Sequence, residues 1–336
     1  MVQKIDPKND RRHFLKTSAT ALAAAQLMGT GAWAGANEKV RVAVVGVHGQ
    51  GRTHIRQYLE INEAELAALC DVDENVLDKA CEELIVSKGL PKPKLFWNYR
   101  ELLEDPSIDA VSFATPNHWH SLQAIWGCQA GKHVYVEKPL AITMEQLDDI
   151  KAAYERNNQH VFVGFNRRHS PFAKFIKENM STDKYPCIIQ YTVNAGYIPK
   201  EHWTQDPEVG GGRIIGEACH FIDLAVFLTG SLPESVNTAA IVGSTDHYSS
   251  SDNVSINLTF KNGSVANIIY TAMGSKSFPK ERVTVFCNGN VGEINNFVSA
   301  TVYGNKRKKL RKMEQDKGFV EEYYSMAKTM QLDKSE

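Results

Sequence analysis

A glycine-rich turn near the front of the chain constrains its fold more than any other feature. The apolar run 42–45 leads directly into Gly46, Gly49 and Gly51, spaced G-x-x-G-x-G, and a segment of helical character follows. This order is typical of a buried parallel strand that runs into a helix whose first amides face a pyrophosphate. A side chain at these glycines would block the turn or hold phosphates away from the backbone. We therefore expect a dinucleotide site that includes Gly46, His48, Gly49, Gly51 and Arg52.

An acidic residue indicates which dinucleotide is bound. Asp71 ends the next strand-like run, about 20 residues after the turn, where a carboxylate suits a ribose 2′-hydroxyl and repels a 2′-phosphate. We therefore expect NAD rather than NADP.

Length and charge narrow the class of protein. A chain of 336 residues favours two domains, and its net charge of −1 attracts neither nucleic acid nor anionic lipid. The six cysteines include no C-x-x-C pair, so we expect no structural disulfide and no metal site.

The first 34 residues have the pattern of a targeting segment. Arg11-Arg12 precedes an alanine-rich stretch that ends in Ala32-Trp33-Ala34, a cleavage signal. We expect residues 1–34 to be a twin-arginine signal peptide read by the twin-arginine export machinery, and a periplasmic or otherwise exported protein with no membrane anchor after processing. The alternative is a disordered tail that contains two arginines.

Two patterns follow one another along the rest of the chain. Strand-like and helical segments alternate over 38–158, which indicates βαβ units and a parallel sheet. Over 159–336 strands are frequent, and Asn262-Gly263 and Asn288-Gly289 favour tight hairpin turns. We therefore expect an α/β fold with a dinucleotide-binding domain at 38–158 and a second α/β domain at 159–336 on a mostly antiparallel sheet. The expected strands are 40–45, 65–70, 110–114, 133–136 and 160–165, and the expected helices include 74–88, 118–130, 143–154 and 214–228.

Polar residues follow two of the expected parallel strands. Ligands of such sheets bind outside the carboxyl ends of the strands. Thr115, Pro116 and Asn117 lie at one such end, where the threonine and asparagine can donate hydrogen bonds to a cofactor. Glu137 and Lys138 lie at the next, and as strand neighbours they point to opposite sides. We expect Glu137 on the cofactor side and Lys138 toward a substrate, whereas an ordinary surface ion pair is the alternative.

A histidine on the expected helix is the candidate base. Glu217 and His220 are three residues apart and share a helix face, and the glycines at 210–212 lead into it. A carboxylate that fixes the tautomer of a histidine makes it a competent general base near neutral pH. We interpret Lys138, His220 and Glu217 as catalytic, with a satisfied core histidine as the alternative for His220.

Taken in order, these motifs resemble the glucose–fructose oxidoreductase and inositol dehydrogenase (Gfo/Idh/MocA) family over about 38–330. The resemblance implies a Rossmann domain, a second domain on a large open sheet, a tightly bound nicotinamide cofactor, and a sugar or cyclitol substrate. It matches Lys138 to the catalytic lysine and His220 to the catalytic histidine of the family, and adds His120 to the cofactor site. The segments 166–168 and 197–203 resemble its pocket, which gives Arg168, Tyr197, His202 and Trp203 as substrate contacts.

The chain departs from the family at one position. The family usually has an aspartate four residues before the histidine, where this chain has Gly216. Glu217 is the carboxylate nearest in sequence, about 100° further round a helix.

Three functions remain open at this stage. The first is an oxidoreductase that moves a hydride between a sugar or cyclitol hydroxyl and the cofactor, with Lys138 stabilising the alkoxide and His220 as base. The second is an exported NAD-dependent glycosidase that oxidises its substrate transiently and releases no net NADH. The third is a non-catalytic sugar sensor. Because an open sheet usually needs a partner to cover it, we expect a homodimer or homotetramer.

Overall fold

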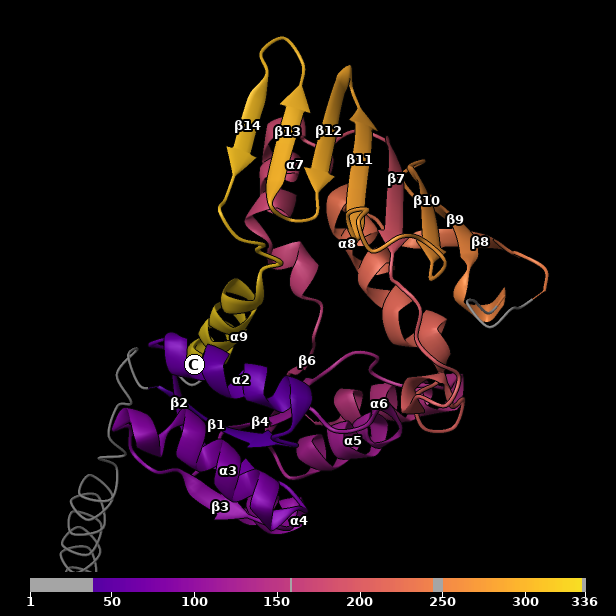
Figure 1. Cartoon of the computed structure of the whole chain (residues 1–336). Helices are drawn as coiled ribbons and strands as arrows, with labels where there is room; N and C mark the ends of the chain where they lie inside the picture. The colour runs from indigo at the N-terminus through magenta and orange to yellow at the C-terminus, as the bar shows by residue number, and fades with distance from the viewer. Residues whose placement is uncertain (1–38, 158, 244–249, 334–336) are drawn as a thin grey trace, which may run out of the picture.

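The computed structural model describes residues 39–157, 159–243 and 250–333, so the expected signal segment lies outside the described residues. Two sheets occupy separate halves of the molecule (Figure 1). The first has six parallel strands in the order β3-β2-β1-β4-β5-β6. Its strands are β1 (Val40–Val45), β2 (Ala64–Cys70), β3 (Lys94–Phe96), β4 (Ala110–Phe113), β5 (His133–Val136) and β6 (Val161–Val163).

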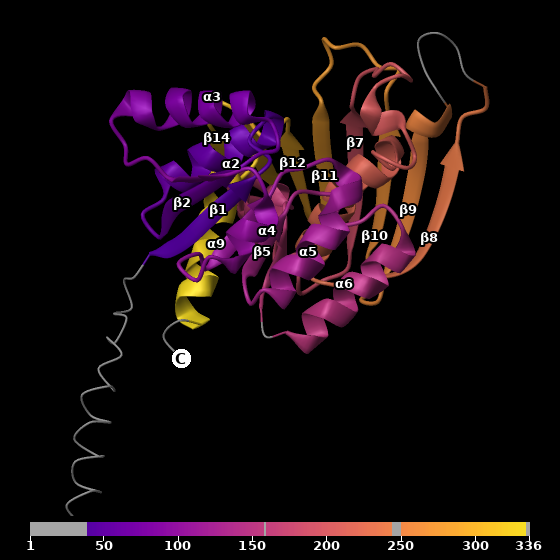
Figure 2. The ribbon, with the colours of Figure 1, turned by 90° about the horizontal axis from the view of Figure 1, so that it is seen from below.

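Helices cover both faces of this first sheet. Alternate residues of β1 face opposite cores, with Val42 and Val44 on one side and Ala43 and Val45 on the other. Figure 2, seen from below, shows α5 and α6 lying apart from α2 and α3. One face packs against α2 (Gly49–Glu60), α3 (Glu74–Leu84) and α9 (Phe319–Asp333), and the other against α4 (Tyr99–Glu104), α5 (His120–Gln129) and α6 (Met144–Arg156).

The second sheet has eight strands in the order β14-β13-β12-β11-β7-β10-β9-β8, antiparallel except for the pair β7–β10. Helices α7 (Pro171–Met180) and α8 (Cys219–Thr229) pack on one face. The strands are β7 (Cys187–Asn194), β8 (Pro233–Ala240), β9 (Val254–Phe260), β10 (Val265–Thr271), β11 (Glu281–Cys287), β12 (Asn290–Asn295), β13 (Ser299–Tyr303) and β14 (Lys308–Arg311).

The other face of this sheet carries exposed apolar side chains. Ile188, Ile269 and Phe286, each between 37% and 59% exposed, alternate with buried residues on β7, β10 and β11. The period of two places every second side chain on this face, opposite α7 and α8.

These observations confirm the expected fold class: a Rossmann-like domain followed by a mostly antiparallel α/β domain. The hairpins form at Asn262-Gly263 and at Asn288-Gly289, where both Asn288 and Gly289 have positive φ. The helix expected over 74–88 stops at Leu84 and is followed by a separate 3₁₀ turn, Val86–Lys88. The elements β3 and α4 have only three and six residues, too few to show a hydrophobic period.

Two parts of the range 159–336 join the first half of the molecule. β6 pairs with β5 and completes the six-stranded sheet. The chain then crosses to the second sheet and returns as α9, which lies beside α2 (Figure 1). Tyr323, Met326 and Met330 of α9 are buried in the same core as Ile55 and Tyr58 of α2.

The structure also shows the state of the cysteines and whether any described helix could cross a membrane. All six cysteines are free, and five of them are buried. No helix in the described ranges has the length and apolar character needed to cross a bilayer.

Candidate active site

Steric contacts explain the glycines of the turn after β1. Gly46 has a φ of +82°, and a Cβ there would lie 2.7 Å from the carbonyl oxygen of Ala114. A Cβ on Gly51 would lie 1.7 Å from the carbonyl oxygen of Gly46, so the turn cannot close around a larger residue. A Cβ on Gly49 would meet no atom within 4 Å. The turn is therefore tightly packed at Gly46 and Gly51, whereas the space beside Gly49 at the start of α2 is open.

Asp71 braces this turn from the end of β2. Its carboxylate accepts hydrogen bonds from the backbone N–H groups of Val47 (2.9 Å) and Asp73 (3.1 Å). A carboxylate has about four acceptor sites, so capacity remains for a ribose hydroxyl.

A cavity of about 420 Å³ opens beside the turn, and we call it the turn cavity. Its wall combines the start of α2, the strand ends after β4 and β5, and the loop before α8. Ten of the predicted site residues line it: His48, Gly49, Thr115, Pro116, Asn117, His120, Glu137, Lys138, Trp203 and Glu217.

Glu137 and Lys138, which follow β5, both line the turn cavity but make polar contacts with different elements. The buried carboxylate of Glu137 lies 3.0 Å from Nε2 of His54 on α2, whose Nδ1 contacts the hydroxyl of Ser112. Burial alone would raise the pKa of Glu137, but the hydrogen bond and charge of His54 lower it. Glu137 therefore joins α2 to the strand ends.

The ammonium of Lys138 reaches the second domain. Its Nζ donates a hydrogen bond of 3.0 Å to the carbonyl oxygen of Gly216. This is the position where the resemblance led us to expect an aspartate. A backbone carbonyl therefore contacts the ammonium of Lys138 here, and no described ion pair joins that ammonium to a carboxylate; only the backbone N–H of Lys138 donates to a carboxylate, that of Glu137, at 3.2 Å.

A second cavity, of about 310 Å³, lies beyond Lys138, and we call it the histidine cavity. It shares Gln50, Glu137, Lys138 and Glu217 with the turn cavity. It adds Gly164, Asn166, Arg167, His220, Lys280, Gln315, Lys317 and Phe319. The structure thus brings the three residues predicted as catalytic, Lys138, His220 and Glu217, to the wall of one cavity.

The imidazole of His220 is buried, and its surroundings favour the neutral form. Burial first, then the positive charges of Arg167 and Lys138, hold the pKa of His220 well below its usual value. Lys317 and Lys280 act in the same direction. Its Nδ1 has no hydrogen-bond partner among the described residues. A neutral imidazole with a free ring nitrogen can accept a proton from a ligand.

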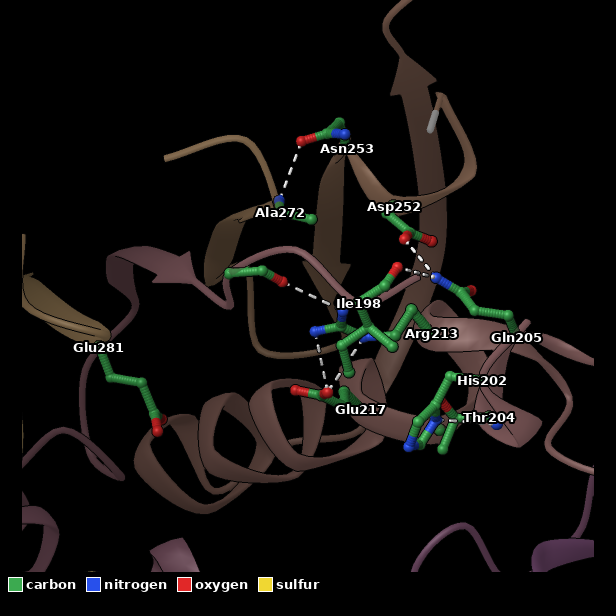
Figure 3. A network of polar contacts seen from close by, with 12 residues as sticks. Ile198, His202, Thr204, Gln205, Arg213, Glu217, Asp252, Asn253, Ala272 and Glu281 are labelled. Atoms are coloured by element: carbon green, nitrogen blue, oxygen red, sulfur yellow. Dashed lines mark hydrogen bonds and ion pairs between the residues drawn. The ribbon is translucent and has the colours of Figure 1, made fainter. Parts of the chain in front are cut away.

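The expected contact between Glu217 and His220 is wrong. The carboxylate of Glu217 accepts from Nε (3.2 Å) and pairs with a terminal nitrogen (3.1 Å) of Arg213, and Figure 3 shows these two side chains pointing toward each other. The turn Ile214–Ala218 is π-helical. A π turn is wider than an α turn, so the α-helical spacing that aligned 217 with 220 does not apply.

Arg213 also anchors the loop that closes the turn cavity. It is buried and donates to the carbonyl oxygen of Gly196 at 3.2 Å. In the same network Gln205 donates to Asp252 at 2.7 Å (Figure 3). His202 accepts from the backbone N–H of Thr204 and contacts its hydroxyl.

Four predicted site residues are held in contacts outside the two cavities. Arg52 pairs with Glu83 on α3 at 2.5 Å. Arg168 forms a two-pronged pair with Asp223 on α8, and its neighbour Arg167 lines the histidine cavity instead. Tyr197 lines a third cavity with Lys276 and Phe278, and His202 caps its own turn.

His120 lines the turn cavity, but both ring nitrogens face backbone carbonyls. Nδ1 lies 2.7 Å from the carbonyl oxygen of Pro139, and Nε2 lies 2.9 Å from that of Thr115. Burial lowers the pKa of His120 although both carbonyls favour its protonated form. His120 therefore ties the ends of β4 and β5 together.

Several cavity residues were missed as site residues from the sequence. Asn166 and Arg167 belong to the segment 166–168, which resembles the pocket of the family, but the expected substrate contact in this segment is Arg168. Arg213 directly follows the glycines 210–212, a signal that could have found it. Lys280 and Lys317 lie in loops without a motif, and only the structure brings them to His220.

The turn cavity fits a nicotinamide dinucleotide. The first turn of α2 has no side-chain cap, and although the N–H of Gly51 donates to the carbonyl oxygen of His48, no side chain competes for the N–H groups of Gly49 and Gln50, which suits a pyrophosphate. The open space at Gly49 lets phosphates approach the backbone. No group of three or more His, Cys, Asp or Glu side chains within the described ranges is arranged to hold a metal ion.

Family comparisons agree with this geometry. Residues 40–165 match the oxidoreductase family with an NAD-binding Rossmann fold. Residues 187–304 match the GFO/IDH/MocA C-terminal domain.

Curated relatives align over shorter ranges. Glycosyl hydrolase family 109 protein 1 of Shewanella sp. (strain MR-4) is 38% identical over 130 residues, which cover 38% of this chain and 28% of that protein. Alpha-N-acetylgalactosaminidase of Shewanella oneidensis has the same identity and coverage. The chain therefore spans less than a third of the length of these two relatives.

Solved structures share the fold across both domains. The oxidoreductase domain protein from Kribbella flavida has a TM-score of 0.74 at 18% identity, over 88% of this chain and 90% of that chain. Levoglucosan dehydrogenase in complex with NADH has a TM-score of 0.71 at 20% identity, over 88% of this chain and 89% of that chain. Because the two family matches together take in most of the sequence, the chain belongs to the Gfo/Idh/MocA oxidoreductase family.

Proposed function

We propose that the protein is an NAD-dependent oxidoreductase that transfers a hydride between a secondary hydroxyl of a sugar or cyclitol and its cofactor. The observation that carries this proposal is the position of Lys138, whose side chain lines both cavities. One cavity has the uncapped helix start and glycine turn of a dinucleotide site, and the other contains His220. Levoglucosan dehydrogenase, whose fold is shared, supports a carbohydrate substrate.

The residues of the chain divide the chemistry between them. A bound nicotinamide ring supplies the hydride acceptor. His220 would take the hydroxyl proton on a ring nitrogen, so that a C=O bond could form as the hydrogen leaves the same carbon with its electron pair for the acceptor that the bound ring would supply. Lys138 donates a hydrogen bond to the same oxygen and stabilises its negative charge. Donors placed in this way are worth about 2.7–4 kcal/mol in comparable sites.

The identity of the cofactor has its own support. Asp71 holds a carboxylate beside the turn, where it would bind a ribose hydroxyl and repel a 2′-phosphate. We propose NAD, tightly bound. Mass spectrometry of the cofactor released from the purified protein tests this: NAD is expected, whereas NADP contradicts the role of Asp71.

The experiment for the activity uses the purified protein with its bound cofactor and a panel of sugars and cyclitols. Reduced nicotinamide should form with one substrate class, and its absorbance measures the rate. The substitution Lys138→Ala should abolish most of that rate while the released cofactor stays the same. Equal rates in the two proteins contradict the proposal.

A second candidate is a glycosidase that oxidises its substrate transiently. The supporting observation is the 38% identity over 130 residues to proteins named glycosyl hydrolase family 109 and alpha-N-acetylgalactosaminidase. Nitrophenyl glycosides separate the two functions. Released nitrophenolate without net reduced nicotinamide supports the glycosidase, whereas accumulating reduced nicotinamide supports the dehydrogenase.

Export and self-association remain proposals as well. The twin-arginine pattern at Arg11-Arg12 supports export, and cell fractionation with Arg11→Lys/Arg12→Lys as the control variant tests it. The exposed apolar face of the second sheet supports a homodimer or homotetramer. Light scattering after size-exclusion chromatography measures the mass, and a monomer contradicts this.

A further inference from the structure

The histidine cavity has an excess of positive charge. Lys138, Arg167, Lys280 and Lys317 line it, against Glu137 and Glu217. Both lining carboxylates have partners, Glu137 in His54 and Glu217 in Arg213. Counting Arg213 and Glu281, which pair with lining residues, five cationic side chains face three carboxylates.

The buried carboxylate of Glu281 neutralises only part of this charge. It binds Arg167 through two bonds, of 2.7 and 2.8 Å, and also binds Lys317 at 2.7 Å. One carboxylate thus serves two cations, and Lys317 keeps further N–H donors. Lys280, the neighbour of Glu281 in the sequence, is exposed and has no described ion-pair partner.

Two buried polar atoms in the same cavity lack partners among the described residues. Nδ2 of Asn166 is one, in a residue that is 1% exposed, and Nδ1 of His220 is the other. Oδ1 of Asn166 accepts from Arg167 at 3.3 Å, which assigns the opposite atom as an N–H donor. Buried donors without partners are uncommon in folded proteins, and a bound ligand is one way to satisfy them.

We propose that the substrate is an acidic sugar, and that Lys280 and Lys317 bind its carboxylate or phosphate beside His220. This inference rests on the proposed function, because it names the substrate class of the same site. An anion here would gain charge-assisted hydrogen bonds from the two lysines. It would also offset the excess positive charge in a partly buried space, where charges are weakly screened.

The same cationic side chains lower the pKa of His220. After burial, the four causes that lower the pKa of His220 are Arg167, Lys138, Lys317 and Lys280. All four are cationic residues of the same cavity. These four side chains therefore make the electrostatic potential positive beside His220, where the reacting sugar would lie.

The experiment measures binding to the purified protein with its cofactor by calorimetry. The probes are matched pairs: methyl β-D-glucuronide against methyl β-D-glucoside, methyl α-D-galacturonide against methyl α-D-galactoside, and glucose 6-phosphate against glucose. We expect the acidic member of at least one pair to bind about tenfold more tightly than its neutral partner. The first two pairs report a carboxylate and the third a phosphate. The preference should weaken as NaCl is raised.

Two lysine variants assign the preference to residues. Lys280→Gln should reduce the preference about tenfold. Lys276→Gln, at an exposed lysine that lines the third cavity with Lys280 but does not line the histidine cavity, should change the preference less than about twofold. Lys280 is preferred to Lys317 for this test because Lys317 pairs with the buried Glu281.

Three outcomes would overturn the inference. The acidic member could bind no more tightly than its neutral partner in every pair, or the two lysine variants could have equal effects. Lys280→Gln could instead weaken NAD binding as much as sugar binding, which would assign the cations to the cofactor. An acidic sugar that binds through Lys280 but is never oxidised would leave this inference standing and overturn the proposed function.

Discussion

The turn cavity and the histidine cavity share a wall but are built differently. The turn cavity owes its shape to the main chain, because the glycine turn, the start of α2 and the carbonyls around His120 define it. The histidine cavity owes its shape to side chains that reach in from several elements and are held by ion pairs such as Arg167–Glu281. Main-chain geometry suits a ligand common to a whole family, whereas side chains can change with the substrate.

Lys138 belongs to both cavities, so its loss should have the largest effect. We expect Lys138→Ala to lower turnover by about 10²–10³-fold, because the oxygen of the substrate loses its donor. Binding of NAD should persist, since the turn is intact. Steady-state kinetics and the amount of bound NAD measure the two properties, with Lys151→Ala on the exposed face of α6 as the control. Turnover unchanged by Lys138→Ala would remove this residue from the mechanism.

The turn cavity alone should respond to Gly51→Ala. The new Cβ would lie 1.7 Å from the carbonyl oxygen of Gly46, so the turn must move. We expect NAD binding to weaken by about 10²-fold, or ~3 kcal/mol. Gly89→Ala is the control, because a Cβ on Gly89 would meet no atom within 4 Å and Gly89 does not line either cavity. Calorimetry with NAD gives the comparison, and equal affinities in the two variants would contradict the dinucleotide site.

The histidine cavity alone should control the pH dependence. Protonation of His220 removes the base, and its pKa is held below the usual 6.5, so activity should persist to lower pH than an ordinary histidine allows. Removing a cation by Lys280→Gln raises this pKa, which should move the acidic limb of kcat/KM upward by a few tenths of a pH unit. His220→Gln should abolish the limb. A limb that survives in His220→Gln assigns the base to another group.

The smallest effect should come from Glu217, which lines both cavities but pairs with Arg213. We expect Glu217→Gln to change kcat/KM by less than about threefold, the range of a partly exposed ion pair. The acidic limb should stay in place, because Glu217 makes no described contact with His220. Disappearance of the limb in this variant would restore Glu217 as the partner of His220.

The main-chain features of the turn cavity could be predicted from sequence, whereas the side-chain contacts of the histidine cavity could not. The fold class, the glycine turn and the strand ends at Thr115 and Lys138 follow from local patterns, because each depends on neighbours in the chain. The pairing of Glu217 failed because a single π turn changes which residues share a face. Lys280 and Lys317 reach His220 only through the folding of distant loops, which no local period encodes.

The return of α9 links the two ends of the described chain. Tyr323, Met326 and Met330 complete a core whose other members begin at Val40. The half of the molecule that is synthesised first therefore cannot finish burying its apolar surface until the last described helix has been made. A ribosome stalled before residue 319 would accordingly hold a first domain whose core beside α2 and α3 still lacks the side chains of α9.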